Sequence, residues 1–299
     1  MRKIRAAVVG YGNIGRFTVQ ALEAASDFEI AGIVRRQGAQ GKPAELAAYN
    51  VVGDIAELKD VDVAILAVPT RSCEEYARKI LAMGINTVDS FDIHTQILGY
   101  RNNLMSICRE NGAVAVIAAG WDPGSDSVVR TLMRSLAPKG LSYTNFGPGM
   151  SMGHSVCVRS KEGVKNALSM TIPKGEGIHR RMVYVELEDG ASLEEVTKAI
   201  KEDPYFANDE THVFQVPSVD DVRDMGHGVH LVRKGVSGQT QNQRMEFNMS
   251  INNPALTGQV LVNVARASMR QQPGCYTMIE IPVVDYLPCD RETAIGQLV

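Results

Sequence analysis

The distribution of apolar and polar residues predicts alternating strands and helices along the first 120 residues. An apolar run, Ile4 to Val9, precedes a stretch with one apolar face at helical spacing, and Glu29 to Val34 then alternates before it becomes apolar. The alternation continues through strands expected at Val63 to Val68, Asn86 to Val88 and Ala113 to Ala118, and helices expected at Ser72 to Met83 and Ile93 to Glu110. This order predicts an α/β fold with a Rossmann-type, doubly wound parallel sheet.

The pattern changes beyond residue 140, where polar and apolar residues alternate in segments with few helices between them. These segments are Ser155 to Arg159, Met182 to Leu187, Val229 to Val232 and Arg244 to Ile251. Such alternation is typical of strands with one solvated face, so we expect a second, α+β domain with a mainly antiparallel sheet.

Two helices are expected in this half. Leu193 to Lys201 follows Ser192 as N-cap, and Glu195 would complete a capping box. A longer helix is expected from Pro254 to about Gln271. Proline is favoured in the first turn of a helix, and the sequence Pro273-Gly274 cannot continue one.

We therefore expect two domains. Residues 1–120 would bind a dinucleotide, and residues 121–271 would form a substrate-binding and dimerisation domain. Residues 272–299 contain a predicted strand and short helix, and we expect them to return to the first domain.

Composition narrows the classes of partner. The 299 residues are 44% hydrophobic and 22% charged, and the net charge of −3 gives no general basic surface. We therefore expect a globular protein with no nucleic-acid partner. Neither a signal peptide nor an apolar stretch of about 18 residues is visible, so we expect a cytoplasmic protein without a membrane partner. The five cysteines lack metal-ligand spacing, which predicts reduced thiols and no metal.

A glycine motif follows the first predicted strand directly: Gly10, Tyr11, Gly12, Asn13, Ile14 and Gly15. The first glycine permits a tight turn, the second lets backbone approach a pyrophosphate, and the third lets the helix pack closely on the strand. The helix N-terminus then supplies free N–H groups for phosphates. The alternative is a plain βαβ unit without a ligand, but the strand before and the helix after the motif favour dinucleotide binding.

The second predicted strand ends on Arg35 and Arg36. An acid at this place would bind the ribose 2′-OH of NAD, whereas arginine binds a 2′-phosphate through charge-assisted hydrogen bonds. The pair therefore predicts NADP, with a solvated basic turn as the alternative.

Ligands in such sheets lie beyond the carboxyl ends of the strands. The residues found at the later strand ends are Pro69, Thr70, Arg71 and Ser72; Asp89, Ser90, Phe91 and Asp92; and Gly120, Trp121, Asp122 and Pro123.

Two acids among them, Asp92 and Asp122, each follow an aromatic residue. Carboxylates beside a nicotinamide suit an amine-bearing substrate, because they accept hydrogen bonds from an ammonium group and take part in proton transfer. The alternative is that Asp92 caps the following helix and Asp122 precedes a helix start at Pro123. Trp121, the only tryptophan, is either a core residue or the wall of a ligand pocket.

The second half contains a loop rich in glycine and methionine, from Tyr143 to Ser155. Its backbone N–H groups could hold a carboxylate, or the loop is a tight crossing between domains. Thr171, the cluster His179-Arg180-Arg181, and His227 between two glycines are further candidates for binding a carboxylate. Alternate residues of a strand face opposite ways, so only one of Arg180 and Arg181 can point into a cleft.

Taken in order, these segments resemble the meso-diaminopimelate dehydrogenase family over essentially the whole chain. The resemblance rests on nine motifs: GYGNIGR at 10–16, VRR at 34–36, VPTRS at 68–72, DSFDIH at 89–94, AGWDPG at 119–124, TNFGPGMSMGHS at 144–155, MTIP at 170–173, GHGV at 226–229 and INNPALT at 251–257.

The resemblance implies a role for each matching residue. Asp92 and Asp122 would hold the amino groups and take part in catalysis, with Trp121 beside them, and Phe146, Met152 and Gly153 would line the reacting end. Thr171, Arg181 and His227 would bind the distal carboxylate, and Asn253 would add a polar contact. Arg181 is thereby selected over Arg180, although its spacing from Thr171 is shorter than in members with an insertion, which indicates a shorter-chain subgroup.

The cofactor implied is NADP, held by a set of residues at the strand ends: Gly10, Tyr11, Gly12, Asn13, Ile14, Gly15, Arg35, Arg36, Pro69, Thr70, Ser90, Phe91 and Pro123. The reaction implied is reversible oxidative deamination at the D-centre of meso-2,6-diaminopimelate, giving L-2-amino-6-oxopimelate and ammonia, by a homodimer. Two rival functions are another NADP-dependent amino or imino acid reductase and a non-catalytic NADP-binding sensor. A sensor would not need acids and an aromatic residue at two strand ends.

Overall fold

The structure is a computed structural model that describes residues 2–222 and 226–299. It contains two compact units: the residues up to Thr131 together with Pro254–Val299, and Leu132–Asn253.

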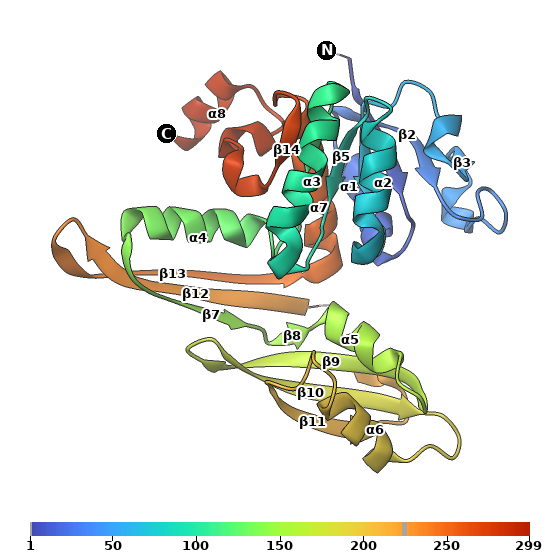
Figure 1. Cartoon of the computed structure of the whole chain (residues 1–299), viewed down its shortest axis with the longest axis vertical. Coiled ribbons are helices and arrows are strands. Elements are labelled where there is room, and N and C mark those ends of the chain that lie inside the picture. The colour runs from blue at the N-terminus through green and yellow to red at the C-terminus, as the bar shows by residue number, and fades with distance from the viewer. Residues whose placement is uncertain (1, 223–225) are drawn as a thin grey trace. The chain divides into compact units, whose positions relative to one another are not determined.

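The first unit is built on a seven-stranded sheet in which all paired strands run parallel (Figure 1). Its strand order is β14-β6-β5-β4-β1-β2-β3. The bounds are β1 (Ile4–Val9), β2 (Phe28–Val34), β3 (Val51–Val52), β4 (Val63–Leu66), β5 (Asn86–Asp89), β6 (Val114–Val116) and β14 (Gly274–Tyr276). The order reverses between β1 and β4, and this is where a doubly wound sheet opens a crevice for a ligand.

Helices cover both faces of this sheet. One face packs against α1 (Asn13–Ala24) and α7 (Asn253–Ser268), and the other packs against α2 (Cys73–Leu81) and α3 (Ile97–Glu110). Residues alternate between the two cores along β1, because successive side chains of a strand point to opposite faces. The prediction of a Rossmann-type sheet is confirmed.

The chain ends also belong to this unit. β14 pairs in parallel with β6, and α8 (Arg291–Leu298) follows it. Residues 254–271, which we assigned to the second domain, lie in the first compact unit because α7 packs on the sheet with α1. Residues 121–131 lie there too, within the loop after β6 and the first half of α4 (Ser125–Leu136).

The second unit contains two sheets that are mainly antiparallel, as predicted. Three strands follow the order β13-β12-β7: β7 (Lys139–Phe146), β12 (Gly226–Ser237) and β13 (Thr240–Asn252). Four strands follow the order β11-β10-β9-β8: β8 (Gly149–Met150), β9 (Val164–Gly175), β10 (Ile178–Leu187) and β11 (Glu210–Gln215). Only the pair β10 and β11 is parallel among the described strands of this unit.

Two helices, α5 (Met152–Arg159) and α6 (Leu193–Lys201), share a core with the four-stranded sheet. The bounds of α6 are those predicted, and the Ser192 hydroxyl accepts from the Glu195 N–H at 3.4 Å. The strand predicted at Ser155 to Arg159 is wrong. It is part of α5, in which Ser155 and Val158, three residues apart, form the buried face.

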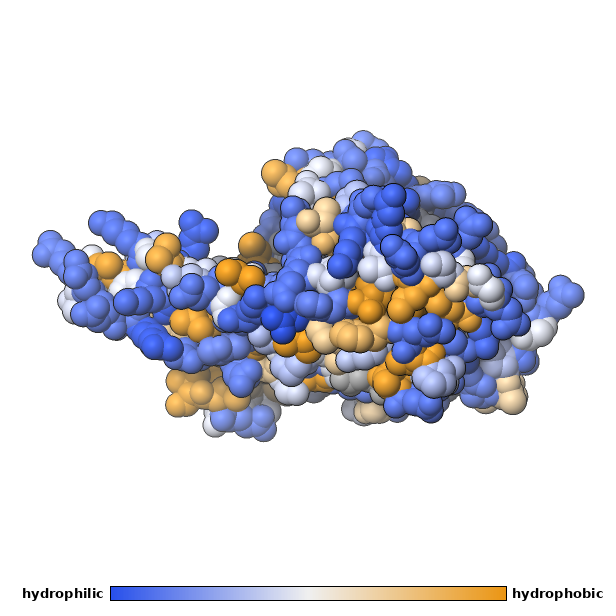
Figure 2. All heavy atoms as spheres, turned by 90° about the horizontal axis from the view of Figure 1, so that it is seen from below, coloured by the Kyte–Doolittle hydropathy of each residue, from blue (hydrophilic) through white to orange (hydrophobic). Residues whose placement is uncertain are grey.

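Polar side chains dominate the face of the molecule seen in Figure 2, with apolar groups scattered among them. No described helix is long and apolar enough to cross a membrane.

Candidate active site

The glycine turn has the geometry that a dinucleotide requires. Gly10 has a φ of +97°, and a Cβ there would lie 2.4 Å from the Ala67 carbonyl oxygen. A Cβ on Gly15 would lie 2.3 Å from the Gly10 carbonyl oxygen, so neither site admits a side chain. A Cβ on Gly12, the N-cap of α1, would meet nothing within 4 Å among the described residues. The free N–H groups of α1, beginning at Asn13 and Ile14, therefore start beside open space suited to a pyrophosphate.

Arg35 follows β2 at the neighbouring strand end. Its backbone N–H donates to the Val52 carbonyl at 2.9 Å, which fixes the start of the side chain. Its buried Nη1 atom has no hydrogen-bond partner in the described part of the chain. Because a buried guanidinium nitrogen normally has a partner, this atom fits a bound 2′-phosphate. Arg36 is exposed.

The loop after β4 contacts the loop after β5. Pro69 precedes the 3-10 turn Thr70–Ser72, and the Thr70 hydroxyl donates to Asp92 Oδ1 at 2.7 Å. Asp92 is exposed, and it does not cap a helix: Ile93 precedes the 3-10 turn His94–Gln96, and α3 begins only at Ile97. The alternative that Asp92 is a helix cap is therefore wrong.

Asp89, which we did not select, connects the loops after β5 and β6. Its side chain is 0% exposed and accepts from the Phe91 N–H at 2.9 Å, the Ala118 N–H at 3.2 Å and the Tyr100 hydroxyl at 2.8 Å. Burial raises the pKa of the Asp89 carboxyl to about 6, against these three hydrogen bonds. Ser90 lies next to it, and a Cβ on Gly120 would lie 3.6 Å from the Ser90 Cβ.

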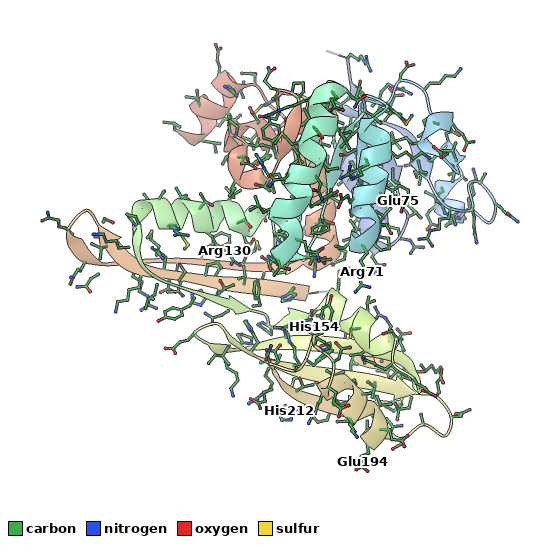
Figure 3. The ribbon with its side chains drawn as sticks, viewed as in Figure 1. Arg71, Glu75, Arg130, His154, Glu194 and His212 are labelled. Carbon is green, nitrogen blue, oxygen red and sulfur yellow. The ribbon has the colours of Figure 1, made fainter. Side chains whose placement is uncertain are left out.

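Asp122 lies in the loop after β6, at the start of α4. Its side chain is 15% exposed and lies 3.5 Å from the Arg130 guanidinium. Arg130, on α4 (Figure 3), also binds the buried Asp126 at 2.6 Å. Burial, then the charge of Asp126, raises the pKa of Asp122 to about 7, and Arg130 opposes this rise. The charge of Asp92, in the loop after β5, raises the pKa of Asp122 further.

Trp121 and Pro123, on either side of Asp122, are both buried. The Trp121 carbonyl accepts from the Asp126 N–H at 3.0 Å, and the Pro123 carbonyl accepts from the Gly120 N–H at 2.9 Å. Helix α4 begins at Ser125 and not at Pro123. The contacts of these residues with a ligand remain predictions.

The glycine-rich loop of the second unit is a tight crossing of strands within this unit. Gly147 has a φ of +94°, donates to the Gly228 carbonyl at 2.8 Å, and leaves only 2.2 Å between an added Cβ and the Thr171 carbonyl oxygen. A Cβ on Gly149 would lie 2.4 Å from the His227 Cα. The N–H of Ser151 donates to the Ser169 carbonyl at 2.8 Å. Gly147 and Ser151 use their N–H groups internally and have none to offer a carboxylate. The expected alternative, a crossing between domains, is wrong as well, because the loop and its partners all lie within the second unit.

This crossing brings together predicted substrate residues from three strands. Phe146 ends β7 opposite Val229 of β12, and its N–H donates to His179 Nε2 at 2.8 Å. Thr171 of β9 and the buried His227 of β12 lie against the same loop through Gly147 and Gly149.

Arg181 and Thr171 face each other across β9 and β10, and the Arg181 guanidinium donates to the Thr171 hydroxyl. Arg181 Nε also donates to Asp209 at 2.6 Å, and both side chains are largely buried. Arg180 points to the other side of the strand, where its Nε forms an ion pair with the Glu210 carboxylate at 2.8 Å. The two arginines thus lie on opposite faces, as strand geometry predicts.

Met152 and Gly153 form the first turn of α5, whose start is fixed by His154 (Figure 3). His154 Nδ1 lies 2.8 Å from the Ser151 hydroxyl and Nε2 lies 2.9 Å from the Tyr205 carbonyl. Burial lowers the pKa of His154 to about 4, so its ring is neutral at pH 7. Asn253 is buried at the first position of α7.

Sequence reasoning missed three acids, Asp89, Asp126 and Asp209. Asp89 stood among the strand-end residues but preceded the more obvious Asp92. Asp126 was detectable as an i, i+4 partner of Arg130 on a helix. Asp209 is 28 residues from Arg181 and meets it only through strand pairing, so nothing in the sequence marks it.

No group of three or more His, Cys, Asp or Glu side chains within residues 2–222 and 226–299 could hold a metal ion. All five cysteines are unpaired, and three of them are buried.

A Rossmann unit with a dinucleotide turn, and two acids at its later strand ends, define an NAD(P)-binding oxidoreductase fold. The oxidoreductase family with an NAD-binding Rossmann fold matches residues 4–88, and the diaminopimelic acid dehydrogenase C-terminal domain matches residues 120–180. The chain is 70% identical to the meso-diaminopimelate D-dehydrogenase of Bacteroides fragilis over 100% of both chains. It is 33% identical to that of Lysinibacillus sphaericus, over 94% of this chain and 95% of the relative. The chain belongs to the meso-diaminopimelate D-dehydrogenase family.

Solved structures agree with this assignment. The Corynebacterium glutamicum DAP dehydrogenase in complex with DAP matches with a TM-score of 0.89 at 28% identity, covering 100% of both chains. An engineered D-amino acid dehydrogenase bound to NADP+ matches with a TM-score of 0.82 at 27% identity, covering 99% of this chain and 100% of that one.

Proposed function

We propose that this chain catalyses the NADP-dependent, reversible oxidative deamination of the D-centre of meso-2,6-diaminopimelate. The products are L-2-amino-6-oxopimelate and ammonia, and the reaction belongs to lysine biosynthesis. The observation that carries the proposal is the 70% identity to a meso-diaminopimelate D-dehydrogenase over the whole chain. Membership of a shorter-chain subgroup is part of the proposal.

The preference for NADP rests on Arg35, whose buried Nη1 lacks a partner among the described residues. The relative solved with NADP+ supports the same choice. The pyrophosphate would be held by the N–H groups that follow Gly12, and the 2′-phosphate by Arg35 with Arg36. The loops at Pro69-Thr70, Ser90-Phe91 and Pro123 would contact the rest of the dinucleotide. When bound, its nicotinamide would supply the hydride acceptor for the substrate Cα–H.

Asp92 and Asp122 would bind and orient the substrate's amino group. A carboxylate accepts two or more N–H bonds, and two carboxylates fix the direction in which the ammonium group points. Asp122, whose pKa is raised to about 7, changes its protonation state near neutral pH. We therefore assign proton transfer to Asp122, and the orienting role to the exposed Asp92, which Thr70 holds.

The second unit would bind the far end of the substrate. Thr171, Arg181 and His227, with Asn253, would supply hydrogen-bond donors for its carboxylate, whereas Phe146, Met152 and Gly153 would line the reacting end. Asp209 holds Nε of Arg181 and the Thr171 hydroxyl accepts from Nη1, so the N–H groups that would be offered to the ligand are mainly those of Nη2. Reading both ends at once would let the enzyme distinguish the D-centre from the L-centre.

The direct test is reduction of NADP+ by the purified protein with meso-, LL- and DD-diaminopimelate, followed by absorbance at 340 nm and an ammonia assay. We expect activity that depends on the meso isomer and releases ammonia. Activity with the LL isomer alone, or binding of NADP without turnover of any amino acid, would refute the proposal. Light scattering tests whether the protein is a homodimer. A fully active monomer would show that dimerisation is not part of the proposed function.

A further inference from the structure

One buried atom, Oδ1 of Asp89, joins the two loops that carry Asp92 and Asp122. It accepts the Phe91 N–H at 2.9 Å and the Ala118 N–H at 3.2 Å. Phe91 directly precedes Asp92, and Ala118 lies in the loop that leads to Asp122. The ends of two neighbouring strands, β5 and β6, are thus fixed to the same oxygen.

The loop after β6 is held in a conformation that it would not adopt by itself. Ala118 has a φ of +53°, which costs a non-glycine residue about 1 kcal/mol or more. The side chain of Asp89 binds the N–H of Ala118, and its backbone carbonyl accepts the N–H of Ala119 at 2.8 Å. Asp89 therefore holds two successive amides of this strained turn.

The second oxygen of Asp89 has a different partner. Oδ2 accepts from the Tyr100 hydroxyl of α3 at 2.8 Å, and the Tyr100 ring packs on Phe91 with 4.7 Å between centroids. A carboxyl group that is 0% exposed stabilises a fold less than a well-packed apolar residue does. One oxygen of Asp89 binds the two loops and the other binds α3, which indicates that this residue positions the loops.

We propose that Asp89 is a positioning residue for the dehydrogenase reaction. Its Oδ1 fixes residues 90–92 and 118–122 so that the Asp92 and Asp122 carboxylates meet the amino group of the substrate in one geometry. The inference rests on the proposed function, because it takes these two acids as the amine-binding groups.

Three variants separate this role from general stability. Asp89→Ala removes the acceptor for both loops. Asp89→Asn keeps an oxygen for the two N–H groups, and its NH2 group donates to the Tyr100 oxygen. Tyr100→Phe removes only the bond at Oδ2 and retains the ring against Phe91, so it is the matched control. Asp89→Ser, whose side chain is too short to reach both loops, replaces Asp89→Ala if circular dichroism shows that the latter is unfolded.

The first measurement is the kinetics of meso-diaminopimelate oxidation together with NADPH binding by fluorescence. A displacement of about 1 Å at a reacting centre costs about 10²-fold in rate. We therefore expect kcat/KM to fall about 10²-fold in Asp89→Ala, with a clearly smaller loss of NADPH affinity, because most of the proposed cofactor contacts lie outside the two segments that Asp89 fixes. Asp89→Asn and Tyr100→Phe should stay within about 5-fold of the wild type. Equal losses of turnover and of cofactor affinity would indicate a merely structural role and overturn the proposal.

The second measurement does not depend on turnover. Trp121, the only tryptophan, lies in the loop after β6 and is 6% exposed. Acrylamide quenching of its fluorescence should increase in Asp89→Ala and remain at the wild-type level in Asp89→Asn and Tyr100→Phe. Unchanged quenching in Asp89→Ala, or an Asp89→Asn variant as defective as Asp89→Ala, would overturn the role of Oδ1. An inactive wild-type protein would instead refute the proposed function. The quenching experiment would then still test whether Asp89 fixes the loop after β6.

Discussion

The protonation state of a single side chain, Asp122, depends on charged groups from two elements. Asp126 and Arg130 face it from α4, and Asp92 faces it from the loop after β5. Burial and the two acids raise the pKa of Asp122, and Arg130 lowers it. The effects of Asp126 and Arg130 therefore have opposite signs.

We expect substitutions of Asp126 and Arg130 to shift the pH dependence of kcat/KM for amine oxidation in opposite directions. If the ionised Asp122 binds the ammonium group, kcat/KM rises as the pH increases through about 7. Asp126→Asn removes a negative neighbour, lowers the pKa of Asp122, and should move the rise to lower pH by about 1 unit. Arg130→Met removes a positive neighbour and should move it to higher pH by a similar amount. Arg134→Met, further along the helix, is the control, and shifts of Asp126→Asn and Arg130→Met in the same direction would contradict the assignment.

The two arginines after β2 should contribute unequally to cofactor choice. Arg35 is partly buried with an unpartnered Nη1 within the described chain, whereas Arg36 is exposed. A charge-assisted pair contributes about 1.5–3 kcal/mol, so Arg35→Met should weaken NADP binding about 10- to 100-fold and leave NAD binding nearly unchanged. Arg36→Met should have the smaller effect. Equal losses for both cofactors, measured by titration calorimetry, would disprove the 2′-phosphate assignment.

Arg180 and Arg181 provide a matched pair for the distal carboxylate, because they share a strand and face opposite ways. Arg181→Met should lower kcat/KM for meso-diaminopimelate about 10- to 100-fold, the value of a lost charged hydrogen bond. Activity with D-alanine, which has no second carboxylate, should change much less. Arg180→Met should leave this ratio unchanged, and the same change in both variants would remove Arg181 from the site.

Some residues of the candidate site could be selected from the sequence and others could not, and the difference has a physical cause. The glycine turn is local: Gly10 has a positive φ and Gly15 packs against the Gly10 carbonyl, so the motif alone predicted the turn. Asp92 and Asp122 were selected because strand ends face the crevice of a doubly wound sheet, and their role in the site stays a prediction. Asp209 and Asp89 are defined by pairing between strands and by burial, which a single sequence does not display.

At the level of elements, the errors came from short segments. Ser155 to Arg159 alternates like a strand, but the segment is the end of α5, which starts inside the glycine-rich loop at Met152. A segment of five residues is compatible with both the two-residue repeat of a strand and the 3.6-residue repeat of a helix. The segment is helical because Ser155 and Val158 pack together on the four-stranded sheet. The start of α3 was placed four residues early because a 3-10 turn precedes it.

The crossing of β7, β9 and β12 depends on Gly147, and it gives a prediction at this scale. Alanine there would require a φ of +94° and a Cβ 2.2 Å from the Thr171 carbonyl oxygen. We expect Gly147→Ala to lower the free energy of unfolding by about 2–4 kcal/mol, because strain and a backbone clash add. Gly153→Ala is the control for stability: the nearest atom lies at 3.8 Å and the site is helical, so it should be neutral or slightly stabilising. Similar urea midpoints for the two variants would contradict this account of the crossing.

At the scale of the whole molecule, the first unit is assembled from both ends of the chain. Strand β14 lies at one edge of a sheet whose central strand is β4, with β1 beside it, and α7 packs on the same face as α1. The sequence predicted the return of the last residues from their apolar strand and helix. It did not predict that α7 belongs to this unit, because the partners of a helix are set by packing that its own periodicity does not identify.

An ion pair between the two ends makes this assembly testable. Arg266, near the end of α7, binds both oxygens of Asp27, which lies between α1 and β2, at 2.5 and 3.0 Å. It also donates to the Tyr286 carbonyl at 3.0 Å and lies 5.2 Å over the Phe28 ring. The Arg266 side chain is 5% exposed, so its loss leaves the partly buried Asp27 carboxylate and the buried Tyr286 carbonyl without this donor. Arg266→Met should therefore lower the free energy of unfolding by about 2–4 kcal/mol in urea titrations.

The control is Arg270→Met, four residues further along the chain. The Arg270 side chain is 34% exposed, so this change should lower the free energy of unfolding by less than about 1 kcal/mol. Equal costs would mean that the ends of the chain are joined by apolar packing alone, and that the ion pair contributes nothing specific to closing the unit.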